Sequence, residues 1–84
     1  MHITFKLYAS LTDYLPIERR NGNAMPLEVP AGATVSQVVA QFALPQKLVH
    51  LVLVNGVFVA PDERASKALA EGDTLALWPP IAGG

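Results

Sequence analysis

Only one stretch of this chain has the apolar spacing of an α-helix, and this restricts the folds that the chain can adopt. Valine and phenylalanine side chains recur at helical spacing between residues 35 and 42, so that one face of the helix is apolar. Thr34 stands at the N-cap position, and Gln37 three residues later completes a capping box. Pro45 is expected to end the helix near residues 43–44. A chain with one such helix is expected to pack the apolar helix face on a β-sheet.

The other apolar stretches have the patterns of β-strands. Apolar and polar side chains alternate in the first and last of them, which is typical of half-buried strands. The run at residues 50–54 is continuously apolar, and we expect a strand that is buried on both faces or nearly so. Asn55-Gly56 then favours a tight turn with positive φ. Another short stretch is bounded by prolines and suits a sheet edge, because proline lacks the N–H donor. The predicted strands are residues 2–8, 26–30, 50–54, 57–59 and 74–78.

The order of these elements is two strands, the helix, two strands, a short turn region and a last strand. This order indicates an α+β protein, and it matches the β-grasp, the ubiquitin-like fold. We therefore expect a mixed sheet of about five strands packed on one main helix. In a β-grasp the last strand lies beside the first at the centre of the sheet. The β-grasp domain is expected to span residues 1–78, with a flexible C-terminal tail at residues 79–84.

The composition argues against several classes of protein. Of the 84 residues, 51% are hydrophobic and 15% are charged, so apolar side chains must remain on the surface, either scattered or as a patch for a partner. Without cysteine the chain has no disulfide, thiolate metal site or cysteine nucleophile. A net charge of −1 without a basic stripe argues against nucleic-acid binding. No apolar run approaches the roughly 20 residues that span a bilayer. No signal peptide precedes the first strand, and we expect a cytoplasmic protein.

No combination of side chains suggests a catalytic or metal site. His2 and His50 are far apart in sequence, and neither has a second metal ligand at close spacing. The carboxylates lie mainly in turns and do not pair at a spacing that suits acid–base catalysis. The serines lack the context of a catalytic nucleophile. We therefore expect no catalytic residue, no metal ligand, no bound cofactor and no enzyme activity of the chain alone. The groups considered are Asp13, Glu18, Glu28, Asp62, Glu63, Glu71, Asp73, Ser10, Ser36 and Ser66.

The C-terminal tail is the part of the sequence that suggests chemistry. Pro79-Pro80 favours an extended conformation and prevents further strand pairing. The four residues that follow, Ile81-Ala82-Gly83-Gly84, end in two glycines without side chains, which suit a narrow active-site channel. A free α-carboxylate on Gly84 can be activated by ATP as an acyl-adenylate. A disordered tail that happens to end in glycine is the alternative, but the Pro-Pro pair directly behind a strand makes the motif more specific.

Residues 71–84, with the sequence Glu-Gly-Asp-Thr-Leu-Ala-Leu-Trp-Pro-Pro-Ile-Ala-Gly-Gly, resemble the C-terminus of the small, sulfur-carrying subunit of molybdopterin synthase. More broadly, the chain is similar to the ubiquitin-like sulfur carriers, which include the thiazole-forming sulfur carrier of thiamine synthesis. The helix start at residues 31–35 and the strand end at residues 53–56 also match this family. The paired prolines favour the molybdopterin branch, whereas Asp73 stands where many members of that branch carry an acidic residue of different length.

The resemblance implies a cycle in which partner enzymes act on Gly84. An adenylating enzyme of the ubiquitin-activating type would activate the carboxylate with ATP and magnesium. A sulfur donor would then convert the adenylate to a thiocarboxylate. A larger acceptor subunit, such as the large subunit of molybdopterin synthase, would receive the tail and pass the sulfur to a small molecule. The residues that would thread into the partner are Pro79, Pro80, Ile81, Ala82 and Gly83.

Trp78 stands where the molybdopterin branch carries an aromatic residue before the prolines. We expect Trp78 and Phe58 to contribute to an apolar docking surface, because interface anchors are often aromatic; a core position for Phe58 is the alternative. Two other functions remain open: a protein modifier that joins Gly84 to lysines, and a simple interaction module. Sulfur carriers for thiamine thiazole, cysteine synthesis, tungsten-cofactor enzymes or RNA thiolation also remain open. The sequence does not identify the acceptor, the activating enzyme or the oligomeric state.

Overall fold

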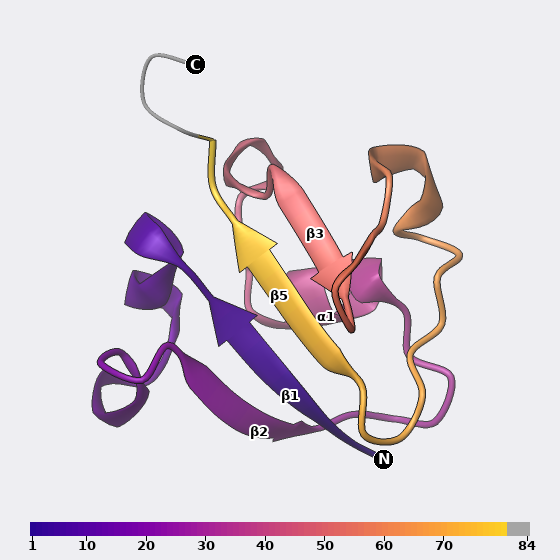
Figure 1. The fold of residues 1–84 in the computed structure, drawn as a ribbon, viewed down its shortest axis with the longest axis horizontal. Coiled ribbons are helices and arrows are strands. Elements are labelled where there is room, and N and C mark those ends of the chain that lie inside the picture. Colours follow the sequence, from indigo (N-terminus) through magenta and orange to yellow (C-terminus); the bar gives the residue numbers. More distant parts are fainter. Residues whose placement is uncertain (81–84) are drawn as a thin grey trace.

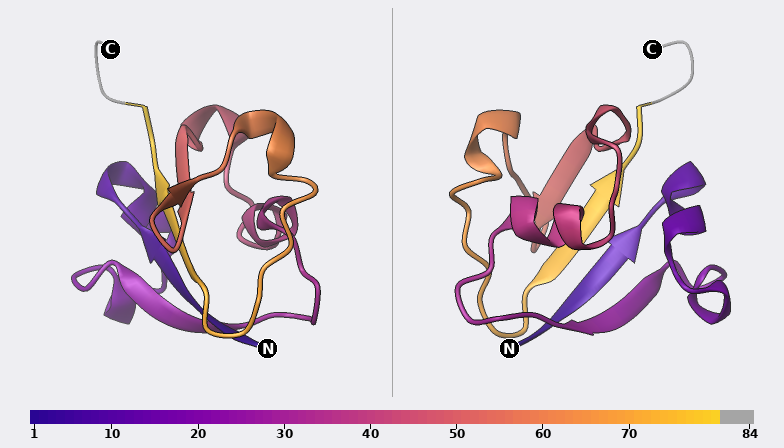
Figure 2. Two further views of the ribbon diagram at one scale, coloured as in Figure 1. Left: turned by 45° about the vertical axis from the view of Figure 1, so that its right-hand side comes forward. Right: turned by 180° about the vertical axis from the view of Figure 1, so that it is seen from behind.

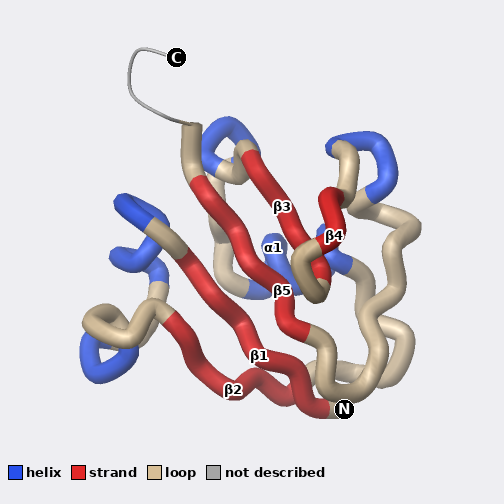
Figure 3. The backbone as a smooth tube through the Cα atoms, in the orientation of Figure 1, coloured by secondary structure: helices blue, strands red, loops and turns tan. Residues whose placement is uncertain are grey.

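The computed structural model describes residues 1–80, which form one five-stranded mixed sheet with a single α-helix on one of its faces (Figures 1 and 3). The strands follow the order β2-β1-β5-β3-β4 across the sheet. Neighbours β1 and β5 are parallel, and the other pairs are antiparallel. The predicted α+β architecture, with the last strand beside the first, is therefore confirmed. The elements are β1 (His2–Leu7), β2 (Ala24–Glu28), α1 (Val35–Gln41), β3 (Leu51–Val54), β4 (Val57–Phe58) and β5 (Thr74–Trp78).

Four short 3-10 helices lie in three of the connections within residues 1–80. Two of them lie in the long connection between β1 and β2, and a third leads from α1 into β3. The fourth follows β4, in the segment that returns to the start of β5. They are η1 (Ala9–Tyr14), η2 (Ile17–Arg19), η3 (Gln46–Leu48) and η4 (Pro61–Glu63).

The helix α1 begins at the predicted capping box. The Thr34 hydroxyl accepts a hydrogen bond from the Gln37 amide at 3.2 Å, and the Gln37 side chain accepts one from the Thr34 amide at 2.8 Å. The two bonds satisfy amides that have no partner within the helix. The valine face of α1 is buried on the sheet, and the Phe42 ring lies 4.5 Å from the Phe5 ring of β1. Figure 2 shows α1 on one side of the sheet, which defines a helix side and an opposite, outer face.

The C-terminus of α1 lies earlier than the position of Pro45 predicts. Ala43 adopts a left-handed conformation with φ +54°, and its amide donates to the Ala40 carbonyl. The Leu44 amide donates to the Val39 carbonyl, which completes a Schellman motif. The helix therefore ends at Gln41 because Ala43 turns the chain, before the proline has any effect.

Because alanine is strained at positive φ, Ala43→Gly is expected to raise the free energy of unfolding by about 0.5–1 kcal/mol. The exposed Ala40, inside α1, provides a matched control: Ala40→Gly is expected to lower it by about 1 kcal/mol. Urea denaturation of both variants measures the two changes. A loss of stability in Ala43→Gly would contradict the assignment of the helix end.

The predicted strands 2–8, 50–54 and 57–59 are each one residue longer than the observed β1, β3 and β4. Two strand predictions were wrong in more than a terminal residue. Strand β2 begins and ends two residues earlier than predicted, because its pairing with β1 places Ala24 opposite Lys6. Strand β3 is buried on one face only: Val52 and Val54 are buried on the helix side, whereas its leucines on the outer face are half-buried. The reason is that no helix of residues 1–80 covers the outer face (Figure 2).

Candidate functional site

The strand β5 holds the base of the tail at the centre of the sheet. The amide of Tyr8 donates to the Leu77 carbonyl at 3.1 Å on the β1 side. The amide of His50 donates to the Trp78 carbonyl at 2.9 Å on the β3 side. Pro79 is half-buried, Pro80 is exposed, and neither has an N–H to continue the pairing. The chain thus leaves the sheet directly after two carbonyls that its neighbours hold in place.

The remaining tail residues, Ile81, Ala82, Gly83 and Gly84, lie outside the described residues. The prediction that they thread into a partner, with Gly84 as the attachment point, therefore stays a prediction. The described residues show where this segment begins. It starts at the end of a strand whose Leu75 and Leu77 side chains are fully buried.

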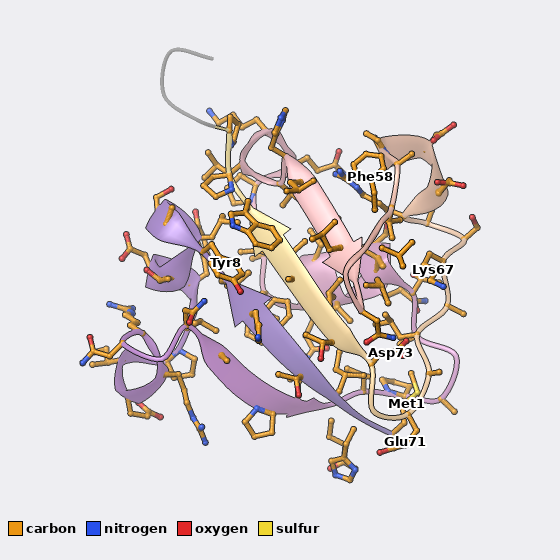
Figure 4. All side chains as sticks on the ribbon, in the orientation of Figure 1. Met1, Tyr8, Phe58, Lys67, Glu71 and Asp73 are labelled. Atoms are coloured by element: carbon orange, nitrogen blue, oxygen red, sulfur yellow. The ribbon has the colours of Figure 1, made fainter. Side chains whose placement is uncertain are left out.

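Trp78 is stacked on Tyr8, a residue that the sequence patterns did not single out. The two rings lie 4.2 Å apart with only 3° between their planes. Tyr8 follows β1 on the outer face, where Figure 4 labels it. The contact depends on the parallel register in which Leu7 lies opposite Leu77. The residues that follow these two, Tyr8 and Trp78, therefore lie side by side. The stack holds the indole ring beside the point where the tail leaves the sheet.

Phe58 lies on the surface, and the alternative that placed it in the core is wrong. Its side chain is 56% exposed, and it pairs with Leu53 of β3. On the other side of β3, Leu53 lies opposite Ala76, and Leu51 lies opposite Trp78. Phe58 and Trp78 therefore belong to one apolar surface that crosses three strands. We define this outer apolar patch as Tyr8, Leu51, Leu53, Phe58, Ala76 and Trp78.

Arg64 holds the segment that leads into β3 by hydrogen bonds. Its Nη1 and Nη2 donate to the carbonyls of Val49 and His50, both at 3.0 Å. Burial of the guanidinium lowers the pKa of Arg64 because the charged form loses hydration. Its buried Nε has no hydrogen-bond partner among the described residues. Arg64 thereby fixes the segment whose His50 amide holds the Trp78 carbonyl.

A groove of about 600 Å³ lies beside Phe58, between β4 and the segment that precedes β5. Figure 4 labels Phe58, Lys67 and Asp73, which line it. Both carboxylate oxygens of Asp73 accept hydrogen bonds at 2.8 Å, one from the Asn55 side chain and one from the Ala70 amide. Asp73 therefore joins two turns. The groove brings together no nucleophile and base at hydrogen-bond distance among residues 1–80.

The other cluster of titratable side chains lies at the opposite end of β1 from the tail. His2 has Glu71 at 3.8 Å from its Nδ1 and Glu28 at 3.9 Å from its Nε2. The His2 amide also donates to Glu71 at 2.9 Å, which ties the start of β1 to the turn before β5. Residues 1–80 contain no cluster of three or more His, Cys, Asp or Glu side chains suited to a metal ion. None of the helices in the same residues has the length and apolar character that a membrane crossing requires.

Comparisons with known proteins place these features in a family context. The model of the ThiS family matches residues 16–84. No curated protein gives a significant match. The structure is similar to that of SAMP1, a small archaeal modifier protein from Haloferax volcanii, with 28% identity, a TM-score of 0.68 and 100% of both chains covered.

Two further similar structures have lower sequence identity and show the fold alone. One is the complex of subunits 1 and 2 of the molybdopterin-converting factor from Helicobacter pylori, with 15% identity, a TM-score of 0.60 and 100% of both chains covered. The other is the thiamine biosynthesis protein ThiS from Geobacter metallireducens, with 14% identity and a TM-score of 0.61. That match covers 96% of this chain and 99% of the other. The predicted resemblance to ubiquitin-like sulfur carriers is confirmed.

Proposed function

Because the chain belongs to the ThiS family of small ubiquitin-like sulfur carriers, we propose that Gly84 carries sulfur as a thiocarboxylate. The observation that supports this most is the position of the tail base. The tail follows a central strand whose last two carbonyls accept hydrogen bonds from Tyr8, directly after β1, and from His50, directly before β3. A rigid body with its reactive group at the end of a narrow segment suits delivery into the active site of another protein.

The proposed chemistry begins with attack of the Gly84 carboxylate on the α-phosphorus of ATP. This step releases pyrophosphate and leaves an acyl-adenylate; the adenylating partner supplies the site and the magnesium. A donor persulfide then attacks the carbonyl carbon and displaces AMP, which gives an acyl disulfide. A second thiol of the donor reduces the sulfur–sulfur bond, so that the thiocarboxylate is released and the donor becomes a disulfide. The chain itself provides the carbonyl carbon and no catalytic side chain.

The outer apolar patch is the proposed docking surface for these partners. It combines three aromatic side chains, Tyr8, Phe58 and Trp78, with the half-buried leucines of β3. Aromatic side chains are enriched among the residues that contribute most to binding energy at protein interfaces. The patch also adjoins the tail base, so a partner that covers Trp78 is well placed to receive residues 79–84.

For the acceptor we propose a larger subunit of the molybdopterin-synthase type. The similarity to the molybdopterin-converting factor complex and the Trp-Pro-Pro segment before the tail support this choice. A thiazole-forming acceptor is the neighbouring possibility, in view of the similarity to ThiS. A protein modifier is the second candidate function, supported by the similarity to SAMP1 over the whole of both chains. Carrier and modifier share the adenylation step and differ in what attacks the adenylate.

Reconstitution with the adenylating enzyme, ATP, magnesium and a persulfide donor tests the proposal. Intact mass spectrometry is expected to show exchange of one oxygen for sulfur on the chain, and the exchange requires ATP. Conjugates between Gly84 and lysine side chains would instead support the modifier. An unchanged mass together with no release of pyrophosphate would rule out both functions. The intact mass of the unreacted chain is measured first, because the proposal requires Gly84 to carry a free carboxylate.

A further inference from the structure

We propose that Lys6 is the residue through which the outer face selects its partner, and that the adenylating enzyme places a carboxylate against it. The inference rests on the proposed function, since it concerns the enzyme that activates Gly84. It adds a charge requirement to a surface that is otherwise apolar.

Lys6 lies on the outer face in the middle of the sheet. In the register of β1 it is opposite Ala24 of β2 on one side and Ala76 of β5 on the other. Ala76 is only 7% exposed although no helix of residues 1–80 lies over it, so the longer side chains around it must cover it. Lys6 itself is half-buried. This burial fits an aliphatic stem that lies along the sheet and ends in an ammonium group at the border of the outer apolar patch.

The charge of Lys6 is not balanced within the described part of the chain. No carboxylate of residues 1–80 lies within 4.0 Å of its ammonium group; the close carboxylate contacts found there are those of Glu28 and Glu71 with the His2 ring. The other strand residues of the outer face with titratable side chains are His2 and Glu28, which face each other at the start of β1. They are four residues along β1 from Lys6, which corresponds to about 13 Å in a strand. Among the strand residues of the outer face, Lys6 is thus a cation beside the apolar patch with no carboxylate within ion-pair distance.

A partner that covers the patch must also accommodate this cation. Bringing an ammonium group into a protein interface costs hydration free energy unless an opposite charge is placed against it. A second copy of the chain suits this poorly, because the carboxylate among the strand residues of its outer face, Glu28, lies at the other end of β1 from the apolar patch. A different protein with an apolar surface and one carboxylate fits better. The adenylating enzyme is the partner that both candidate functions share.

The test measures the affinity of Lys6→Met, Lys6→Glu and Lys6→Arg for the adenylating enzyme from the same organism, at low and at physiological salt. Lys6→Met keeps the stem and is expected to bind about 3- to 10-fold more weakly, with less dependence on salt. Lys6→Glu is expected to bind about 30-fold more weakly or worse, and salt should strengthen its binding. Lys6→Arg is expected to bind within about 3-fold of the original chain.

Arg19→Glu is the matched control, because it makes the same change in net charge at an exposed residue of η2, away from the outer face. The inference is overturned if Lys6→Met and Lys6→Glu bind like the original chain, or if Arg19→Glu weakens binding as much as Lys6→Glu. If the original chain is adenylated normally in either case, the proposed function still stands. If the original chain is neither bound nor adenylated, the proposed function fails, and the inference fails with it.

Discussion

Removal of Gly83 and Gly84 is expected to abolish adenylation while the free energy of unfolding stays unchanged. The deletion shortens the tail by about 7 Å, so the new carboxylate cannot reach the phosphate of ATP when the domain is docked. Loss of correct placement of this kind is expected to reduce kcat/KM at least about 1,000-fold. Stability is expected to persist because the buried core of residues 1–80 extends no further along the chain than Leu77. Pyrophosphate release and urea denaturation measure the two effects.

A variant of unchanged length distinguishes the requirement for tail length from the requirement for a tail without side chains. Gly83→Val keeps the carboxylate at the end of an equally long segment and adds a branched side chain. If the channel is as narrow as the glycines suggest, this variant should lose at least about 100-fold in kcat/KM. Gly22→Val is the matched control, because Gly22 lies in an exposed loop, has ordinary φ and has no atom within 4 Å of an added Cβ. Normal adenylation of Gly83→Val would show that the absence of a side chain there is not required.

Phe58→Asp is expected to weaken binding of the adenylating enzyme about 100-fold. The substitution places a carboxylate within the outer apolar patch, where a docked partner would remove it from water. Because the Phe58 side chain is 56% exposed, the loss of folding stability should stay near about 1 kcal/mol, which is the range of strand propensities. Isothermal titration calorimetry with the enzyme measures the affinity, and urea denaturation measures the stability.

The neighbouring residue provides the control for this experiment. Val57 is 67% exposed and belongs to the same strand, but successive side chains of a strand point to opposite faces. Val57→Asp therefore carries the same cost in strand propensity without placing a charge on the outer face. It should bind the enzyme with an affinity within about 3-fold of the original chain. Equal loss of affinity in both variants would contradict docking through the outer face.

The fold could be predicted from the sequence because each element has a local signal. The alternation in the first and last strands, the capping box of Thr34 and Gln37, and the Asn55-Gly56 turn all act within a few residues. Asn55 and Gly56 indeed have φ of +52° and +80°. The C-terminus of α1 is harder to predict, because a left-handed alanine at residue 43 has no sequence signature comparable to the glycine usual at that position.

The candidate site was harder to predict, because it depends on which strands become neighbours. The stack of Tyr8 on Trp78 needs the parallel pairing of β1 with β5, which joins residues 70 positions apart. Phe58 is exposed because no helix of residues 1–80 covers the outer face of the sheet. The apolar stretch at residues 50–54, with which Phe58 pairs, does not indicate whether that face is covered. Arg64 was missed for a similar reason: its partners are backbone carbonyls, which any residue could supply.

The most direct test of the account is tandem mass spectrometry of the protein isolated from its own cells. Trypsin is expected to release residues 68–84 as one peptide, because Lys67 is the last lysine or arginine in the sequence. This peptide contains no cysteine and no methionine, so any sulfur in it must have been added to the chain. We expect a fraction of the peptide to end at Gly84 with sulfur in place of one carboxylate oxygen. A mature chain that lacks Gly84, or one that ends there and acquires neither sulfur nor AMP when its adenylating enzyme and a persulfide donor are present, would contradict the account.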